Sequence, residues 1–335
     1  MDVLVTLASK ILAQLQSATL GFLVGGMVIA ALGTRLQIPN AIYQFIVFML
    51  LMSIGLEGGM EIREADLVSM LVPAVSAVAV GLLAVGLGLV TLARFPGVKI
   101  DDALATAGLF GAVSSSTLAA GMVALDEANI GHEAWVPALY PFMDIPALIL
   151  AIVLASVLTA KRSGKSAKEV DVGAIVKESL QGGALTALLL GLALGLLIHP
   201  ERVFEEFYEP LFRGFLSILM LVMGMEAYTR LNELRRVAHW YAVYALFAPI
   251  VHGLMGFGFG YVAHVLTGFS PGGVVLLAVI ASSNSDISGP PTLRAGIPSA
   301  NPSAFIGAST SIGTPMAIAV CIPVFVALAD IVFSN

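Results

Sequence analysis

Long apolar stretches recur along almost the whole chain, from Leu20 to Val332, with only short polar gaps between them. A helix that crosses a bilayer needs about 20 mostly apolar residues, so stretches of this length predict membrane-spanning helices. Ten such spans fit the sequence. With 58% hydrophobic and 11% charged residues, the chain is also more apolar than a water-soluble core of this size requires. The sequence therefore predicts an all-α, multi-pass membrane protein.

The charges that flank the ten predicted spans indicate their orientation. When the connections are assigned to alternate sides, twelve of the 16 lysines and arginines lie on one side and four on the other. Cytoplasmic loops carry the excess of basic residues, so both termini are predicted to lie outside the plasma (inner) membrane. The net charge of −6 is spread over loops, so no nucleic-acid partner is expected. The predicted spans are 18–34, 41–57, 68–93, 102–124, 134–159, 182–198, 210–228, 239–266, 272–293 and 303–332.

The two halves of the chain resemble each other in sequence, at a nearly constant separation of 169 positions. Each half holds five spans, an odd number, so the second copy enters the membrane with opposite polarity. This pattern predicts two inverted repeats, 1–160 and 181–335, joined by a cytoplasmic linker at 161–180. Residues 55–57 match 224–226, Ser114 and Ser116 match Ser283 and Ser285, and Pro146 matches Pro315.

Clusters of polar residues fall inside several predicted spans. The fourth span carries hydroxyl side chains at 114–117, and its repeat partner, the ninth, carries a polar run at 282–288 that is followed by two prolines. Proline lacks an N–H donor, and Ser, Asn and Asp compete for backbone hydrogen bonds, so both helices are predicted to be discontinuous. Residues 144–146 and 307–315 are likewise expected to interrupt the fifth and tenth spans.

The opposite polarity of the fourth and ninth spans predicts where a ligand binds. If both break near the midplane, two half-helix N-termini point at one place. Their unpaired N–H groups and partial positive charge suit a small anion without any lysine or arginine. The alternative for any one of these serines is a hydrogen bond to its own helix backbone. The predicted substrate ligands are Ser114, Ser115, Ser116, Thr117, Ser283, Asn284, Ser285 and Ser288.

Two aspartates, Asp144 and Asp286, are predicted at membrane depth. A charged carboxylate at the bilayer centre costs about 2.5–3.5 kcal/mol, so an idle one is not expected there. Carboxylates repel a bare anion, and a co-bound cation resolves that conflict, so sodium is predicted to bind together with the substrate. Helix capping is the alternative role for both residues. The predicted sodium ligands are Asp144, Asp286, Ser116, Ser285 and Thr314.

These features predict a secondary transporter that carries an anion with sodium. No phosphate-binding glycine loop and no nucleophile elbow occurs in the sequence, so an ion gradient is the expected energy source. One alternative is a sodium/proton antiporter in which Asp144 and Asp286 form a proton-accepting pair. An intramembrane aspartyl protease is a further alternative, but neither aspartate follows a glycine. We therefore expect no enzymatic activity.

Five long segments stand out in the sequence, at 109–121, 138–148, 211–227, 247–253 and 283–301. Together they resemble the SbtA family of cyanobacterial sodium-dependent bicarbonate transporters. The resemblance implies sodium symport of bicarbonate, a homotrimer, and a PII-like regulatory partner, SbtB, on the cytoplasmic side. It also implies a core of spans 3–5 and 8–10 that moves against a gate of spans 1, 2, 6 and 7. The resembling segments are LFGAVSSSTLAAG at 109–121, ALYPFMDIPAL at 138–148, LFRGFLSILMLVMGMEA at 211–227, FAPIVHG at 247–253 and SNSDISGPPTLRAGIPSAN at 283–301.

Overall fold

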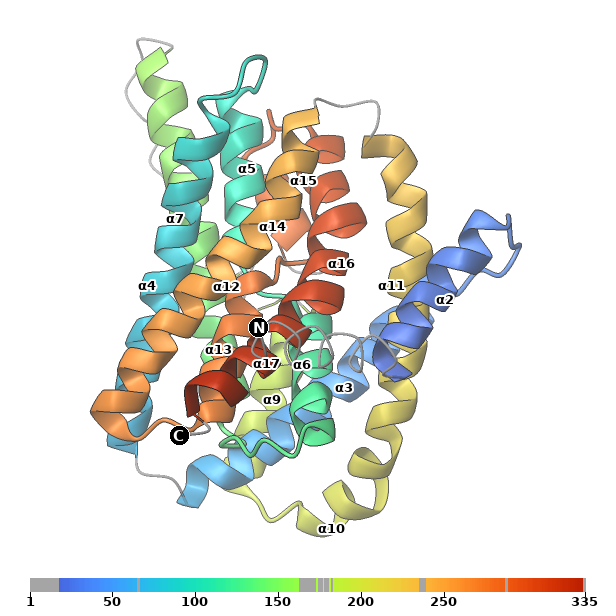
Figure 1. Cartoon of the computed structure of the whole chain (residues 1–335), viewed down its shortest axis with the longest axis vertical. Helices are drawn as coiled ribbons and strands as arrows, with labels where there is room; N and C mark the ends of the chain where they lie inside the picture. Colours follow the sequence, from blue (N-terminus) through green and yellow to red (C-terminus); the bar gives the residue numbers. More distant parts are fainter. Residues whose placement is uncertain are drawn as a thin grey trace.

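The computed structural model describes residues 18–64, 67–162, 183–234, 239–286 and 289–333, together with positions 173, 177 and 181. Every regular element in these ranges is a helix, which confirms the all-α prediction. The long helices run alongside one another (Figure 1). The predicted linker at 161–180 lies almost entirely outside the described residues, and Ser288 lies wholly outside them.

Several helices are long and apolar enough to cross a membrane. Within the described ranges seven segments meet this description: Asn40–Met60, Val68–Leu92, Ile100–Glu127, Val136–Leu158, Glu201–Thr229, His239–Thr267 and Pro302–Phe333. Three shorter apolar helices occupy Leu20–Ala31, Thr186–Leu197 and Pro271–Ser282. Each predicted span overlaps one of these segments, and a count of ten crossings stays a prediction.

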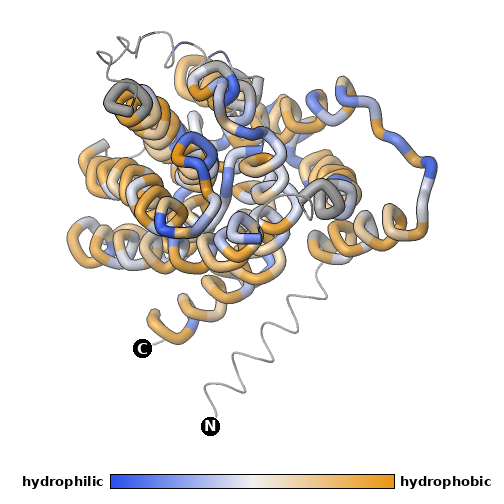
Figure 2. Tube along the Cα trace, turned by 90° about the horizontal axis from the view of Figure 1, so that it is seen from above, coloured by the Kyte–Doolittle hydropathy of each residue, from blue (hydrophilic) through white to orange (hydrophobic). Residues whose placement is uncertain are grey.

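Large apolar side chains face outward along the helices. On α4 (Leu67–Leu92), Val68 is 74% exposed, and on α12 (His239–Thr267) Leu266 is 67% exposed. Figure 2 shows hydrophobic residues along the helices and hydrophilic residues mainly where the chain turns. Surfaces of this kind are stable against lipid rather than against water, which supports a multi-pass membrane protein.

A first helix group is held together by glycines. In this group α2 packs against α11, α3 packs against α9, and α3 also contacts α11. A Cβ atom added to Gly224 would lie 1.9 Å from the carbonyl oxygen of Leu23, and one added to Gly55 would lie 2.4 Å from that of Leu188. Backbones can approach this closely only where a side chain is absent. The group comprises α2 (Ala18–Ala31), α3 (Asn40–Glu64), α9 (Gly183–Leu197), α10 (Glu201–Val203), the π turn η2 (Phe204–Tyr208) and α11 (Glu209–Leu234).

The remaining helices form a second group. Here α4 contacts α5, α7 and α12, while α13 contacts α12 and α17. Besides α4 and α12, the first repeat contributes α5 (Ile100–Gly111), α6 (Ser115–Glu127), the 3-10 turn η1 (Val136–Leu139) and α7 (Tyr140–Arg162). The second repeat contributes α13 (Pro271–Ser282), α14 (Gly289–Gly296), α15 (Pro302–Ala308), η3 (Ser309–Gly313), α16 (Thr314–Met316), η4 (Ala317–Cys321) and α17 (Ile322–Phe333).

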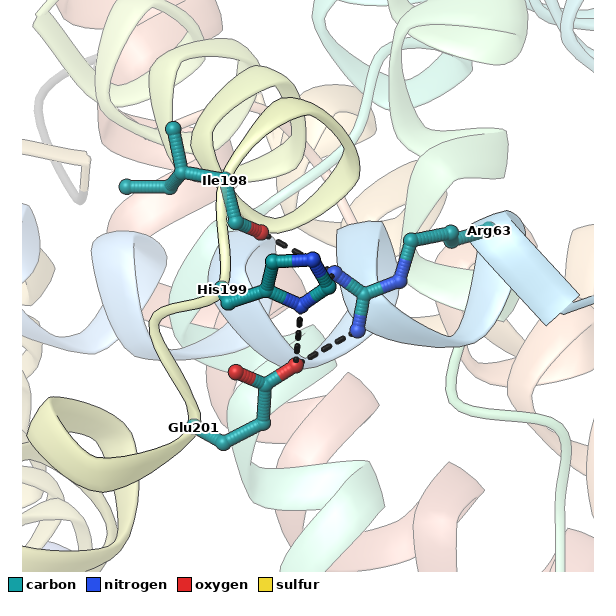
Figure 3. Close-up of polar contacts among 4 residues, drawn as sticks. All are labelled: Arg63, Ile198, His199 and Glu201. Atoms are coloured by element: carbon teal, nitrogen blue, oxygen red, sulfur yellow. Dashed lines mark hydrogen bonds and ion pairs between the residues drawn. The ribbon is translucent and has the colours of Figure 1, made fainter.

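Polar contacts tie helix ends together where the chain turns. At the end of α3, Arg63 donates a hydrogen bond from Nη1 to the carbonyl of Ile198 at 3.0 Å, and from Nη2 to Oε1 of Glu201 at 2.5 Å (Figure 3). In the second group, Oδ1 of the buried Asp102 accepts the Asn301 N–H at 2.7 Å. These contacts fix the connections between helices.

Two predicted interruptions differ from what is observed. The prediction that residues 144–146 break the fifth span is wrong, because α7 continues from Tyr140 to Arg162 with Pro146 inside it. A proline this close to the helix start removes a single backbone hydrogen bond, and packing on α4 and α5 compensates for it. The tenth span is also continuous, and η3 and η4 widen it as π turns without unwinding it.

Candidate functional site

The first half of the site is a break between α5 and α6. The helix ends at Gly111, the backbone is extended at Ala112 and Ser114, and α6 begins at Ser115. Ser114 caps α6, since its Oγ accepts the Thr117 N–H at 3.2 Å. A serine hydroxyl competes well for such donors, so the cluster starts a new helix where a continuous one would otherwise run. The fourth span is therefore broken where the sequence predicted.

The second half of the site lies between α13 and α14. α13 ends at Ser282, and the described residues that follow it, 283–286, are not helical. The Oγ of Ser285 accepts the Gly289 N–H at 2.8 Å at the start of α14. Both breaks thus place a serine at the beginning of the second half-helix.

The two breaks contact each other directly. The Ser114 N–H donates to Oγ of Ser283 at 2.9 Å, and Oγ of Ser116 donates to Oδ2 of Asp286 at 2.9 Å. The Ser285 N–H donates to the Leu109 carbonyl at 2.9 Å. We call this contact region the crossing; it consists of residues 112–117 and 283–286. Two hydroxyl clusters that are far apart in the sequence therefore meet at one place.

Several polar atoms at the crossing are buried and have no hydrogen-bond partner among the described residues. They are Oγ of Ser115, Oγ1 of Thr117 and Nδ2 of Asn284. Leaving a buried polar atom unsatisfied costs about 1–3 kcal/mol, and native proteins contain few such atoms. The hydroxyls can donate or accept, and the amide nitrogen donates. A small polar ligand with its own oxygen atoms would match this set.

The two intramembrane aspartates approach the crossing differently. Asp144, on α7, is 0% exposed; its Oδ1 accepts the Val113 N–H at 2.9 Å, and its buried Oδ2 has no partner in the described part of the chain. Asp286 is partly exposed and accepts from Ser116. The two carboxylates are close enough to interact electrostatically. Both predicted acidic residues therefore belong to the same site, with one unpartnered oxygen on Asp144.

The tenth span also reaches the crossing. The Oδ1 of Asn284 accepts a hydrogen bond from Oγ1 of Thr314 at 2.9 Å and another from Oγ of Ser309. Because both donors bind the amide oxygen, the amide nitrogen is turned away from them. Thr314 thus lies beside the crossing, as the sequence predicted, and Ser309 orients Asn284 from the same span.

One residue near the crossing had no signal in the sequence. Tyr43, on α3, donates its hydroxyl to Sδ of Met223 at 3.7 Å and interacts electrostatically with Asp286 and Glu226. A tyrosine within an apolar span is ordinary, and only the packing of α3 and α11 against the second helix group brings it near the site. Ser288, also predicted as a ligand, lies outside the described residues.

The polar side-chain atoms at the crossing are hydroxyl, carboxylate and amide oxygens and the amide nitrogen of Asn284. No group of three or more His, Cys, Asp or Glu side chains that could hold a metal ion occurs in the part of the chain that the structure describes. Carboxylate, hydroxyl and backbone carbonyl oxygens beside interrupted membrane helices are the ligands that transporters use for sodium. The chemistry therefore fits an alkali cation better than a transition metal.

Comparison with protein families decides the class of the protein. The family model described as the Na+-dependent bicarbonate transporter superfamily matches residues 18–330. The chain belongs to this superfamily. No curated protein matches it in a sequence search. As a member of the Na+-dependent bicarbonate transporter superfamily it is a multi-pass membrane transporter and not an enzyme, with bicarbonate as its substrate and sodium as the co-transported ion.

Proposed function

We propose that this transporter imports bicarbonate by sodium symport, with both ions held at the crossing of the two broken helices. The observation that carries the proposal is the direct hydrogen bonding between the breaks beside the unpartnered Asp144 oxygen. An anion site and a cation site then lie next to each other. Each ion lowers the cost of bringing the other out of water, which couples their transport.

The bicarbonate end of the site consists of donors without a formal charge. The start of α6 offers backbone N–H groups and the positive end of its helix dipole, and Nδ2 of Asn284 offers another donor. Hydroxyls at Ser115 and Thr117 can donate to the anion or accept its O–H. In this assignment the Ser114–Ser283 hydrogen bond and the bond from the Ser285 N–H to the Leu109 carbonyl hold the two breaks in register. Ser288 keeps the role that the sequence predicted.

The sodium end of the site is centred on Asp144. Its Oδ2 supplies a buried negative charge, and Asp286 supplies a second carboxylate on the other side of Ser116. Oγ atoms of Ser116 and Ser285 and Oγ1 of Thr314 are the neutral ligands in this assignment. Removing an unpaired carboxylate from water is costly, so a bound cation stabilises the closed site.

Alternating access follows from the inverted repeats. Ser114 and Ser283 are 169 positions apart and hydrogen-bonded to each other, which is the contact expected where a two-fold axis relates two copies. The core of spans 3–5 and 8–10 corresponds to the second helix group, and the gate of spans 1, 2, 6 and 7 to the first. Rocking of one group against the other would expose the crossing to each side in turn. An even number of spans puts both termini on one side, and the excess of basic residues in the opposite loops makes that side the outside of the plasma membrane, with the 161–180 linker in the cytoplasm.

The assembly follows from the family resemblance alone. We propose a homotrimer, with a PII-like protein of the SbtB type binding the cytoplasmic face. Neither feature is needed for the chemistry at the crossing. Size-exclusion chromatography with light scattering would measure the number of subunits directly.

Uptake into proteoliposomes tests the proposed symport. Radiolabelled bicarbonate should accumulate only with an inward sodium gradient, and the accumulation should collapse in Asp286→Ala. Uptake that is unchanged when choline replaces sodium would overturn the symport. Release of protons from vesicles on addition of sodium without bicarbonate would favour sodium/proton exchange by the two aspartates instead.

A further inference from the structure

Two cavities at opposite ends of the molecule each contain a glutamate at a matched position. One, of about 180 Å³, lies among α3, α6 and the start of α11, and Glu57 lines it. The other, of about 520 Å³, lies between the end of α2 and α11, and Glu226 lines it. In Figure 1 the start of α11 is at the bottom beside α10, whereas the end of α2 is at the upper right.

The two cavities are counterparts under the repeat. Glu57 and Glu226 are 169 positions apart, and so are Ser53 and Val222, which line the same two cavities. Ser53 and Glu57 lie about one helical turn apart on α3, and Val222 and Glu226 lie about one turn apart on α11. The same helix face therefore borders the cavity in both copies. An inverted repeat would place one of the cavities on each side of the membrane.

The α2–α11 cavity has the chemistry of a cation pathway. Its polar lining consists of Thr34, Gln37, Glu226 and Thr229, and no lysine or arginine is among its described lining residues. Glu226 is close enough to Asp286 to interact with it electrostatically. A carboxylate in a recessed cavity raises the local concentration of cations. A cation held at Glu226 would therefore lie within electrostatic reach of the acidic side of the crossing.

The cavity that Glu57 lines has more acidic than basic side chains, and residues of both helix groups line it. Glu57, Asp126 and Glu209 line it together with Arg213 and His132. Nη2 of Arg213 on α11 lies 3.7 Å from Oδ2 of Asp126 on α6. The arginine thus faces one carboxylate at the boundary between the groups, and Glu57 borders the same space from α3.

We propose that Glu57 and Glu226 are sodium-collecting residues, each of which sets the sodium concentration needed for transport from its own side of the membrane. This inference rests on the proposed symport. Neither glutamate belongs to the crossing, so neither ligates the bound ion; each acts through the charge it places in its own cavity. Under the predicted orientation Glu57 collects sodium that enters from outside, and Glu226 collects sodium that enters from the cytoplasm.

Side-resolved transport tests the proposal. Proteoliposomes of one orientation are given sodium on either face, and the half-saturating sodium concentration is measured for bicarbonate influx and efflux. Glu57→Gln should raise this concentration roughly two- to threefold for influx only, and Glu226→Gln roughly two- to threefold for efflux only, which is the effect of a unit charge taken to lie about 8 Å from the ion in water. Glu226→Asp, which keeps the charge, should behave like the wild type.

Controls separate this inference from the symport itself. Glu205 is an exposed residue of η2 that lines neither cavity. Glu205→Gln should therefore leave the half-saturating sodium concentration unchanged for both influx and efflux. The inference is wrong, and the symport stands, if wild-type transport depends on sodium but both variants shift the half-saturating sodium concentration for the same direction of transport, or for neither direction. Wild-type transport without sodium dependence would overturn both.

Discussion

Replacing Asp144 with asparagine should abolish sodium binding while keeping the fold around the site. The side chain is fully buried, its Oδ1 accepts the Val113 N–H at 2.9 Å, and its Oδ2 is unpartnered within the described ranges. Asparagine has the same shape and still offers an oxygen to Val113. The substitution therefore removes the charge and replaces the Oδ2 acceptor with an NH2 donor of similar size.

Coulomb's law gives the size of the expected effect. A sodium ion and a carboxylate about 4 Å apart attract each other by about 4 kcal/mol at an effective dielectric constant near 20. Because about 1.4 kcal/mol corresponds to a factor of ten, sodium affinity should fall by up to roughly a thousandfold. Without sodium, a buried unpaired carboxylate destabilises the fold, so Asp144→Asn should unfold at a higher temperature than the wild type.

Thermal unfolding in sodium or choline chloride measures both effects. At 100 times the dissociation constant, sodium should stabilise the wild type by about 2.7 kcal/mol and Asp144→Asn by almost nothing. Asp102→Asn is the matched control: Asp102 is also buried but bonds the Asn301 N–H, so the variant should be less stable and still respond to sodium. Equal sodium stabilisation of Asp144→Asn and the wild type would refute Asp144 as the sodium ligand.

The crossing, the glycine packing and the ion pair of Arg63 with Glu201 each give a further prediction. Ser116→Ala removes the donor to Asp286 and should lower bicarbonate uptake at least tenfold, since a hydrogen bond to a charged group contributes about 1.5–3 kcal/mol; wild-type uptake would contradict this. Gly224→Leu should yield no folded protein on size-exclusion chromatography, whereas Gly214→Leu, with nothing within 4 Å of the added Cβ, should elute normally. Arg63→Ala should change the free energy of unfolding by about 1 kcal/mol or less and leave uptake intact, because its ion pair with Glu201 is only partly buried; a larger loss would show that the pair contributes more than a surface ion pair does.

The breaks could be predicted from the sequence because their cause is local. Ser114 competes for backbone donors wherever it stands, and the run after Ser282 concentrates the same chemistry near two prolines. The constant separation of 169 positions also indicated which clusters would meet, and Ser114 and Ser283 are in contact. Local propensity and the repeat pattern together were enough to predict the two breaks and their contact.

Other features depend on packing and could not be predicted. Pro146 disrupts an isolated helix, but α7 continues through it between α4 and α5. The hydrogen bond from Ser309 to Asn284 forms at the first residue of a π turn, where the tenth span winds on rather than breaking. A carboxylate at the end of a span is ordinarily solvated, so the sequence alone does not single out Glu226. Only the cavity that it lines and its interaction with Asp286 do so.

A structure determined with sodium and bicarbonate bound would show whether both ions bind at the crossing. The expected result is density for the anion between the start of α6 and Asn284, with a cation on Oδ2 of Asp144. Both ions bound elsewhere in the protein, with the crossing closed and dry, would contradict it.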